Sequence, residues 1–234
     1  MLIEADAKGL EVVGAAYLSQ DPVLCQELHD RVDIHSVNQA TFNLPTRLVA
    51  KTFKFRIIYG GTEYAFTMDS EFNWISKDVN FWKGVIDAYY LKYKGLRKWH
   101  DVIFQQAMLT GGYVSPTGRT YEYTPTLGQW PRTNILNYPV QGFSADLMAI
   151  ARVSARKRLR GLCLMCNTVH DSIVVDTPNK NVYTVCRILE EVFQDIPTNF
   201  RKVFGLDFNL PMMAEIKFGP NWKDMEKYES ANHN

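Results

Sequence analysis

The sequence lacks several features that would place it in a broad class of protein. No run of about 18 apolar residues occurs among its 234 residues, so we expect no transmembrane helix and no membrane partner. Residues 1–6 have neither a basic start nor a long apolar stretch, and we expect no secretory signal. Repeats, low-complexity segments and obvious interdomain linkers are also missing. The chain is therefore expected to form one domain, or one domain with a subdomain.

Net charge is also scarce. The formal charge is +1, whereas a free-standing DNA-binding protein is usually more basic. Local charge is more informative, because five cations crowd one predicted helix. A nucleic-acid contact and a solvated helix face both explain such a cluster, which comprises Arg152, Arg156, Lys157, Arg158 and Arg160.

Cysteine is limited to four residues. Cys163 and Cys166 have CxxC spacing, but they lie in an apolar, strand-like run and no second Cys/His pair follows. We therefore predict buried, reduced thiols rather than a zinc site. A cytoplasmic location fits this cysteine usage.

The apolar periodicity and the turn signals predict an α+β fold. Strands are expected at residues 1–6 and 213–218, and a hairpin of residues 162–168 and 172–176 is expected around Val169, His170 and Asp171. Helices are expected at residues 10–18, 33–41, 141–160 and 181–204. Residues 79–110 are expected to form one or two helices whose aromatic residues pack in the core. A further helix has its start signal at Asn43 and Pro45 and stops at Gly60. Residues 111–123 are expected to form a second hairpin.

Two aspartates lie at the ends of predicted strands. Asp6 ends the first strand and Asp171 lies at the tip of the hairpin. If these strands are neighbours in one antiparallel sheet, the two side chains converge. Paired carboxylates can hold two hard cations about 4 Å apart, which suits nucleotidyl transfer. An isolated Asp in a turn is usually only a turn residue, so neither aspartate predicts this chemistry alone.

The helix that stops at Gly60 carries Arg47, Lys51, Phe55 and Tyr59, four residues apart. Each step of four drifts by about 40°, so the four side chains share one broad face. Two cations suit a triphosphate and two aromatic rings suit a sugar and a base. The alternative is an amphipathic helix whose long basic side chains reach solvent.

These segments together resemble the family A (DNA polymerase I-type) DNA polymerases, most closely their phage members. The first polymerase motif resembles residues 6–11, the second residues 44–60, and the third Val169-His170-Asp171. Supporting matches lie at residues 33–35, 137–142 and 219–222. The matches follow the family order and reach from residue 2 to residue 222.

The resemblance implies a role for each matching residue. Asp6, Asp171 and Lys51 would be catalytic, and the two aspartates with the Ala7 carbonyl would hold two Mg²⁺ ions. Glu11 would exclude a ribose 2′-hydroxyl and bond to Tyr59, which would stack by the templating base. The incoming dNTP would contact Glu11, His35, Arg47, Lys51, Phe55 and Tyr59. Primer–template DNA would contact Asn137, Gln141 and His170.

The chain departs from the family pattern at three positions. Ser172 stands where most members have Glu after the third-motif Asp, which weakens the catalytic assignment slightly. Arg56 replaces a residue that is usually glycine and is a candidate to reach a nucleic-acid phosphate. Arg132 lies one position from the family's arginine, so no role is carried over.

The resemblance implies a right-hand polymerase fold of which the chain holds two parts. The palm, with its antiparallel sheet, would comprise residues 1–36 and 131–234, and the helical fingers insertion residues 37–130. The thumb and the exonuclease domain are expected to be absent. Three explanations stay open: half of a split phage polymerase with a separate N-terminal chain, a gene fragment or truncated chain, and a free-standing palm–fingers protein.

The expected activity is template-directed addition of dNTPs to a primer 3′-hydroxyl, in phage-type DNA replication and in the host cytoplasm. An alternative of a different class is a nucleotide- or DNA-binding subunit that is inactive until an N-terminal partner complements it. A third interpretation is a non-functional remnant. The intact set of Asp6, Lys51 and Asp171 argues against that interpretation.

Overall fold

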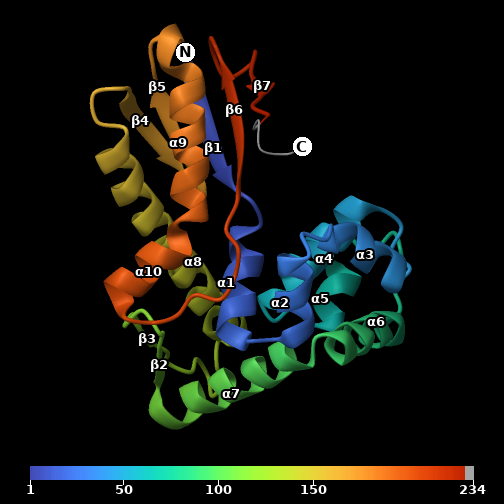
Figure 1. Cartoon of the computed structure of the whole chain (residues 1–234). Helices are drawn as coiled ribbons and strands as arrows, with labels where there is room; N and C mark the ends of the chain where they lie inside the picture. The colour runs from blue at the N-terminus through green and yellow to red at the C-terminus, as the bar shows by residue number, and fades with distance from the viewer. Residues whose placement is uncertain (230–234) are drawn as a thin grey trace. The chain divides into compact units, whose positions relative to one another are not determined.

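A computed structural model describes residues 1–229, and the chain divides into two compact units (Figure 1). Unit 1 comprises Met1–Val13 and Ser144–Asn234, and unit 2 comprises Gly14–Phe143. The chain passes between the units within α1 (Leu10–Ser19) and within α8 (Arg132–Arg158). The division into palm and fingers at residues 36/37 and 130/131 stays a prediction.

Unit 1 is built on a five-stranded sheet in the order β4-β5-β1-β6-β7, with every neighbouring pair antiparallel. The first strand of the chain is therefore central. This confirms the predicted antiparallel sheet of an α+β fold. The strands are β1 (Leu2–Ala7), β4 (Leu164–Val169), β5 (Ser172–Asp176), β6 (Ala214–Gly219) and β7 (Glu226–Lys227).

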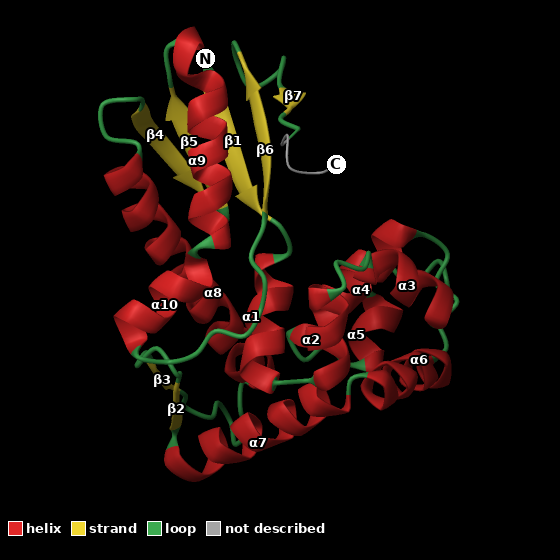
Figure 2. Cartoon of the chain, viewed as in Figure 1, coloured by secondary structure: helices red, strands yellow, loops and turns green. Residues whose placement is uncertain are grey.

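The alternation of residues along β1 decides which face of the sheet is covered. Ile3, Ala5 and Ala7 are at most 1% exposed, whereas Asp6 points away from them and is exposed. Helix α9 (Val182–Gln194) packs across β1 and β6, as Figure 2 shows, and its apolar stripe supplies much of this core. The 3₁₀ turn η1 (Asn179–Asn181) precedes α9, and α10 (Ile196–Phe204) follows it. The sheet thus has one packed face, and the carboxylate of Asp6 is on the other.

Unit 2 is mainly helical. Its helices are α2 (Pro22–His29), α3 (Ile34–Thr41), α4 (Arg47–Ile58), α5 (Glu63–Met68), α6 (Val79–Lys92) and α7 (Lys94–Thr110). The hairpin β2–β3 (Gly112–Val114 and Thr120–Glu122) follows, as predicted for residues 111–123. Residues 79–110, expected to form one or two helices, form two, because the helix is interrupted at Tyr93.

An aromatic cluster forms the core of unit 2. Phe53 of α4 lies 5.1 Å from Phe66, 6.2 Å from Trp82 and 5.7 Å from Tyr89, measured between ring centroids. All four side chains are at most 2% exposed. The expectation that the aromatic residues of 79–110 belong to the core is therefore right for most of them, although Phe81 is 39% exposed.

Several predicted boundaries are wrong. The long helix expected at residues 141–160 begins nine residues earlier, at Arg132, and contains Pro139. Helices α2 and α5 have no counterpart among the predicted elements. Pro22 follows the first predicted helix like a stop signal, but it occupies the first turn of α2, where a missing N–H costs no hydrogen bond.

The cysteine prediction is correct in part. All four thiols are free, but of the two CxxC cysteines Cys163 is only half-buried, and Cys166 is exposed because β4 is an edge strand. Among the described residues, no group of three or more His, Cys, Asp and Glu side chains is placed to hold a metal ion. No helix in residues 1–229 is both long and apolar enough to cross a bilayer.

Candidate active site

The two aspartates singled out in the sequence are brought together by neighbouring strands. Asp6 on β1 pairs in register with Ser172 on β5, the residue after Asp171. The backbone N–H of Ala7 donates to the Asp171 carbonyl over 2.9 Å, which closes the end of this ladder. The predicted convergence of the two strand ends is therefore observed within unit 1.

The local electrostatics favour a cation at this place. Partial burial, followed by the nearby carboxylate of Asp171, raises the pKa of Asp6 to about 6. Glu4 and Glu215 act in the same direction, and Lys217 opposes them. Burial and neighbouring negative charge both disfavour the ionised carboxylate, and a bound cation would offset both effects.

The donor set fits a divalent cation. Carboxylate oxygens are the ligands that Mg²⁺ prefers, and two of them from adjacent strands would relieve their mutual repulsion by sharing metal charge. Beside Asp171, the Oγ of Ser172 is buried and has no hydrogen-bond partner among residues 1–229. Ser172 therefore offers this site a hydroxyl where the family usually offers a carboxylate.

The turn between β4 and β5 presents His170. This residue has a positive φ of 50° and is exposed, and Asp171 beside it is half-buried. A positive φ is uncommon outside glycine and belongs to tight turns. The turn therefore projects His170 from the end of the hairpin, where contact with a ligand is sterically open.

In unit 2, α4 presents the predicted face. Thr46 caps the helix, its hydroxyl accepting the N–H of Val49 over 3.1 Å, rather than the Asn43–Pro45 signal predicted. Arg47 and Lys51 are exposed, and Phe55 and Tyr59 are half-buried with ring centroids 6.5 Å apart. The four residues share one face of the helix, as their spacing predicts.

Arg47 is held by a residue that the sequence did not connect to it. Its Nε lies 2.8 Å from Oδ2 of Asp33 and its Nη2 lies 3.0 Å from Oδ1 of the same carboxylate. This contact with Arg47 holds the pKa of Asp33 well below its usual range. Lys51, one turn further along, makes no ion pair within the described residues. In the sequence, only the Asp-x-His pattern of residues 33–35 indicated that Asp33 belongs to the candidate site.

His35 lies beside the aromatic part of the same face, its ring centroid 6.3 Å from that of Phe55. Burial, then the cations of Lys54 and Arg47, lowers the pKa of His35 to about 4. The imidazole is therefore neutral at neutral pH. Its Nδ1 is buried and finds no hydrogen-bond partner in residues 1–229.

Residues on the first half of α8 lie near the end of α4. Asn137 lines a cavity of about 380 Å³ together with Tyr59, Arg56 and Asp69, whereas Gln141 is exposed. The Oδ1 of Asn137 is buried without a hydrogen-bond partner in the part of the chain described. The Asn137 side chain can therefore accept a hydrogen bond from a bound ligand.

Arg56, a candidate for contact with a nucleic-acid phosphate, is paired with carboxylates of its own unit. Its guanidinium forms an ion pair with Asp69 and lies 3.6 Å from Glu71, while it stacks 6.0 Å from the Phe72 ring. These contacts hold the end of α4 to the turn after α5. The Arg56 side chain is nevertheless 47% exposed, and contact with a nucleic-acid phosphate stays a prediction.

The basic cluster at the end of α8 has two roles. Arg158 pairs with Glu191 and, over 2.9 Å, with Asp195, which joins α8 to α9 and α10. Arg156, Lys157 and Arg160 instead line a groove of about 750 Å³ beside β4. Arg158 therefore fits neither explanation offered by the sequence, a nucleic-acid contact or a solvated helix face, because it holds α8 to its neighbouring helices.

The predicted residues divide between the units. Unit 1 holds the predicted metal ligands and their neighbours, which are Asp6, Ala7, Glu11, His170 and Asp171. Unit 2 holds the other predicted site residues, which are His35, Arg47, Lys51, Phe55, Tyr59, Asn137 and Gln141. The bond expected between Glu11 and Tyr59 joins residues of different units and stays a prediction.

Comparison with known proteins gives a consistent result. The sequence profile of DNA polymerase family A matches residues 1–224. DNA polymerase I of Deinococcus radiodurans is 26% identical over 95% of this chain and 23% of its own length. DNA polymerase I of Geobacillus stearothermophilus is 24% identical over 96% of this chain and 26% of its own length. The chain therefore spans about a quarter of the length of these relatives.

A solved structure has the same fold. The polymerase domain of Pol1 from M. smegmatis, in complex with DNA primer-template and dNTP, superposes with a TM-score of 0.79. The alignment covers 94% of this chain and 40% of that chain at 18% identity. The likeness establishes the polymerase-domain fold.

Proposed function

Because the chain belongs to DNA polymerase family A, we propose that it carries out template-directed addition of dNTPs to a primer 3′-hydroxyl. The observation that carries this proposal is the meeting of Asp6 and Asp171 across β1 and β5. The substrates would be dNTPs and primer–template DNA.

Unit 1 would provide the reaction centre. Asp6 and Asp171, with the Ala7 carbonyl, would hold two Mg²⁺ ions, which supply charge neutralisation at the reacting phosphate. The register between β1 and β5 supports this role, because it would keep the two carboxylates close before substrate binds and little reorganisation would be needed. The exposed turn at His170 would contact the primer–template, and Glu11 would exclude a ribose 2′-hydroxyl.

Unit 2 would bind the nucleotide through α4. Arg47 and Lys51 would contact the triphosphate, and Lys51 would donate a proton to pyrophosphate. Phe55 would pack on the sugar and Tyr59 beside the templating base. His35, neutral at pH 7, would donate a hydrogen bond to a phosphate oxygen. Asn137 and Gln141 would contact the primer–template. In these terms unit 1 is mostly palm, residues 1–36 and 131–234, and unit 2 mostly fingers, residues 37–130.

A second candidate function follows from length and from one strand. The chain spans about a quarter of its relatives, and β4 is an edge strand with nearly all of its residues exposed. An unpaired strand edge invites association. In this alternative the chain is a nucleotide- or DNA-binding subunit of a split phage-type polymerase, working in the host cytoplasm and inactive until an N-terminal chain joins it.

Primer extension separates the two functions. The purified chain would be incubated with primer–template, dNTPs and Mg²⁺, beside Asp171→Asn, which removes the charge but keeps the side-chain shape. We expect extension by the unaltered chain and a loss of at least about 100-fold in Asp171→Asn, the scale typical of lost electrostatic stabilisation. Asp176→Asn, at the opposite end of β5, is the matched control and should extend normally.

The contrary outcomes are distinct. If Asp171→Asn extends the primer at the full rate, the proposal that Asp171 binds metal is wrong. No extension by a folded chain that still binds dNTP would favour the subunit that awaits a partner.

A further inference from the structure

We infer that Asp33 acts as a latch on Arg47. By this we mean that the Asp33 carboxylate stays paired with the Arg47 guanidinium until a polyphosphate takes its place. The inference rests on the proposed function, which gives Arg47 to the triphosphate of an incoming nucleotide. It adds a residue that determines how strongly, and how selectively, phosphate groups bind to α4. Asp33 would be a positioning residue, since it acts through Arg47.

The latch has the geometry of a strong contact. Two nitrogens of Arg47 face two oxygens of one carboxylate, at 2.8 and 3.0 Å. This paired arrangement fits the planar guanidinium and is the same one that a phosphate would use. Asp33 and a phosphate therefore compete for the same donors.

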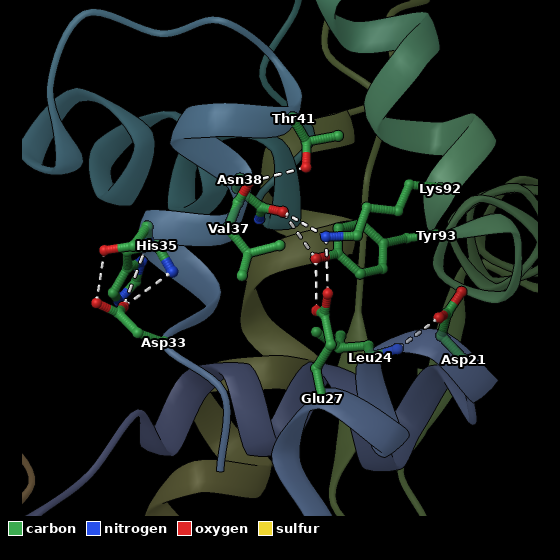
Figure 3. A network of polar contacts seen from close by, with 11 residues as sticks. Asp21, Leu24, Glu27, Asp33, His35, Val37, Asn38, Thr41, Lys92 and Tyr93 are labelled. Carbon is green, nitrogen blue, oxygen red and sulfur yellow. Dashed lines mark hydrogen bonds and ion pairs between the residues drawn. The ribbon is translucent and has the colours of Figure 1, made fainter. Parts of the chain in front are cut away.

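The Asp33 carboxylate is held in place independently of Arg47. It caps α3 by accepting the N–H groups of His35 and Ser36 over 3.2 and 3.4 Å, and the Ser36 hydroxyl over 2.7 Å. Figure 3 shows the carboxylate turned toward these groups at the start of α3. The competitor is thus fixed to the fold, whereas Arg47 is a flexible side chain that can exchange partners.

The latch is also reversible. The side chains of Arg47 and Asp33 are 54% and 46% exposed, and ion pairs at this exposure are weak because water screens them. A ligand with one or two charges would gain little by replacing Asp33. A polyphosphate, which is long enough to contact Lys51 as well, would gain more. The latch would therefore favour triphosphates over orthophosphate on α4.

The test uses inorganic tripolyphosphate, which has the charge of the substrate without its base or sugar. Its dissociation constant would be measured by calorimetry on the purified chain, at fixed ionic strength and without divalent metal. We expect Asp33→Asn to lower the constant about fivefold, which corresponds to about 1 kcal/mol. Asparagine caps helices as well as aspartate, so the fold should persist, and thermal melting checks this.

Two variants control for charge and for shape. Asp78→Asn makes the same chemical change at the cap of α6, where the carboxylate accepts the Asn80 N–H and has no ion pair in residues 1–229. It should leave tripolyphosphate binding unchanged. Asp33→Glu restores the charge and should return affinity toward that of the unaltered chain.

The Arg47→Ala background distinguishes the possible failures. If Arg47→Ala weakens binding and Asp33→Asn then has no effect in that background, the latch is supported. Equal or weaker binding by Asp33→Asn in the otherwise unaltered chain overturns the latch alone. An equal gain with and without Arg47 also overturns it, since the effect would be general electrostatics. No effect of Arg47→Ala on binding overturns the assignment of Arg47 to the triphosphate, and the latch with it.

Discussion

A buried histidine gives unit 2 a pH dependence that the sequence did not indicate. His100 on α7 has no exposed surface, and its Nδ1 lies 3.0 Å from the hydroxyl of Tyr90. Burial, followed by the cation of Arg132, lowers the pKa of His100 to about 3. In an unfolded chain the pKa of the same side chain would be about 6.5.

This difference predicts the direction of the effect. Between about pH 6.5 and 3 the unfolded state binds a proton that the folded state does not, so stability falls as pH falls. The full contribution of neutral His100 is present above about pH 6.5, and the slope below it is up to about 1.4 kcal/mol per pH unit. Urea unfolding from pH 7 to pH 5 should show this slope. His100→Gln should make the slope shallower without abolishing it, because the pKa of His35 is also lowered, to about 4, and His35 adds a slope of the same sign. An unchanged slope would contradict the prediction.

The control for this measurement is His29→Gln. His29 is exposed at the end of α2, so its replacement should leave the slope as it is.

Other single residues show where sequence reasoning stops. The common face of Arg47, Lys51, Phe55 and Tyr59 was predictable, since helical spacing alone determines it. The partners of Arg47 and Arg56 were not, because an ion pair depends on which distant carboxylate the fold brings near. Asp33 lies 14 residues before Arg47. Nothing in their spacing shows that they meet.

At the scale of elements, one aspartate joins two helices in a way that the sequence does not predict. Asp21 caps α2 through the Leu24 N–H over 2.9 Å, and its other oxygen accepts the N–H groups of Gly95 and Leu96 at the start of α7. A single carboxylate thus caps two helices, although Asp21 and Gly95 are 74 residues apart in the sequence. Figure 3 shows Asp21 beside the related contacts of Glu27, Lys92 and Tyr93. The local sequence around Pro22 contains only half of this arrangement.

The shared cap predicts a close fit at Gly95. A Cβ added there would lie 2.6 Å from the Cα of Asp21 and 2.9 Å from its Oδ2, so backbone would have to move. We expect Gly95→Ala to lower the free energy of unfolding by about 1–3 kcal/mol, which chemical denaturation would measure.

Gly84→Ala in α6 is the matched comparison for Gly95. Nothing lies within 4 Å of the added methyl group, so the substitution should stabilise the helix by about 0.5–1 kcal/mol. A loss at Gly84 equal to that at Gly95 would show that the close approach to Asp21 is not the cause.

The start of α8 escapes prediction for a different reason. Pro139 removes one backbone donor within the helix, so residues 132–140 carry a signal that usually ends helices. Ile135, Leu136 and Val140 are fully buried, and their packing outweighs the local preference. The strands β1 and β6 were predictable from their local apolar alternation, and β5 from its short apolar run. Their order in the sheet had to come from the structure.

At the scale of the whole molecule, net charge determines how strongly the chain is expected to bind DNA. The chain carries a net charge of +1, and Arg158 among its clustered cations is already neutralised by Glu191 and Asp195. Affinity for DNA depends on the number of phosphates that a protein neutralises. A chain with little excess positive charge should therefore hold primer–template weakly and release it often.

This predicts distributive synthesis by the chain alone. In primer extension with an excess of unlabelled trap DNA, added together with the dNTPs, we expect products that are only one or a few nucleotides longer than the primer. Extension should also fall between about 50 and 200 mM salt, because counterions compete with the cations of the protein for the DNA phosphates and binding is weak from the start. Replacing Arg156 and Lys157 by Gln tests the groove beside β4: a shallower salt dependence would place DNA there. Long products in the presence of the trap would contradict the prediction, since they require a grip on DNA that the net charge of this chain does not supply.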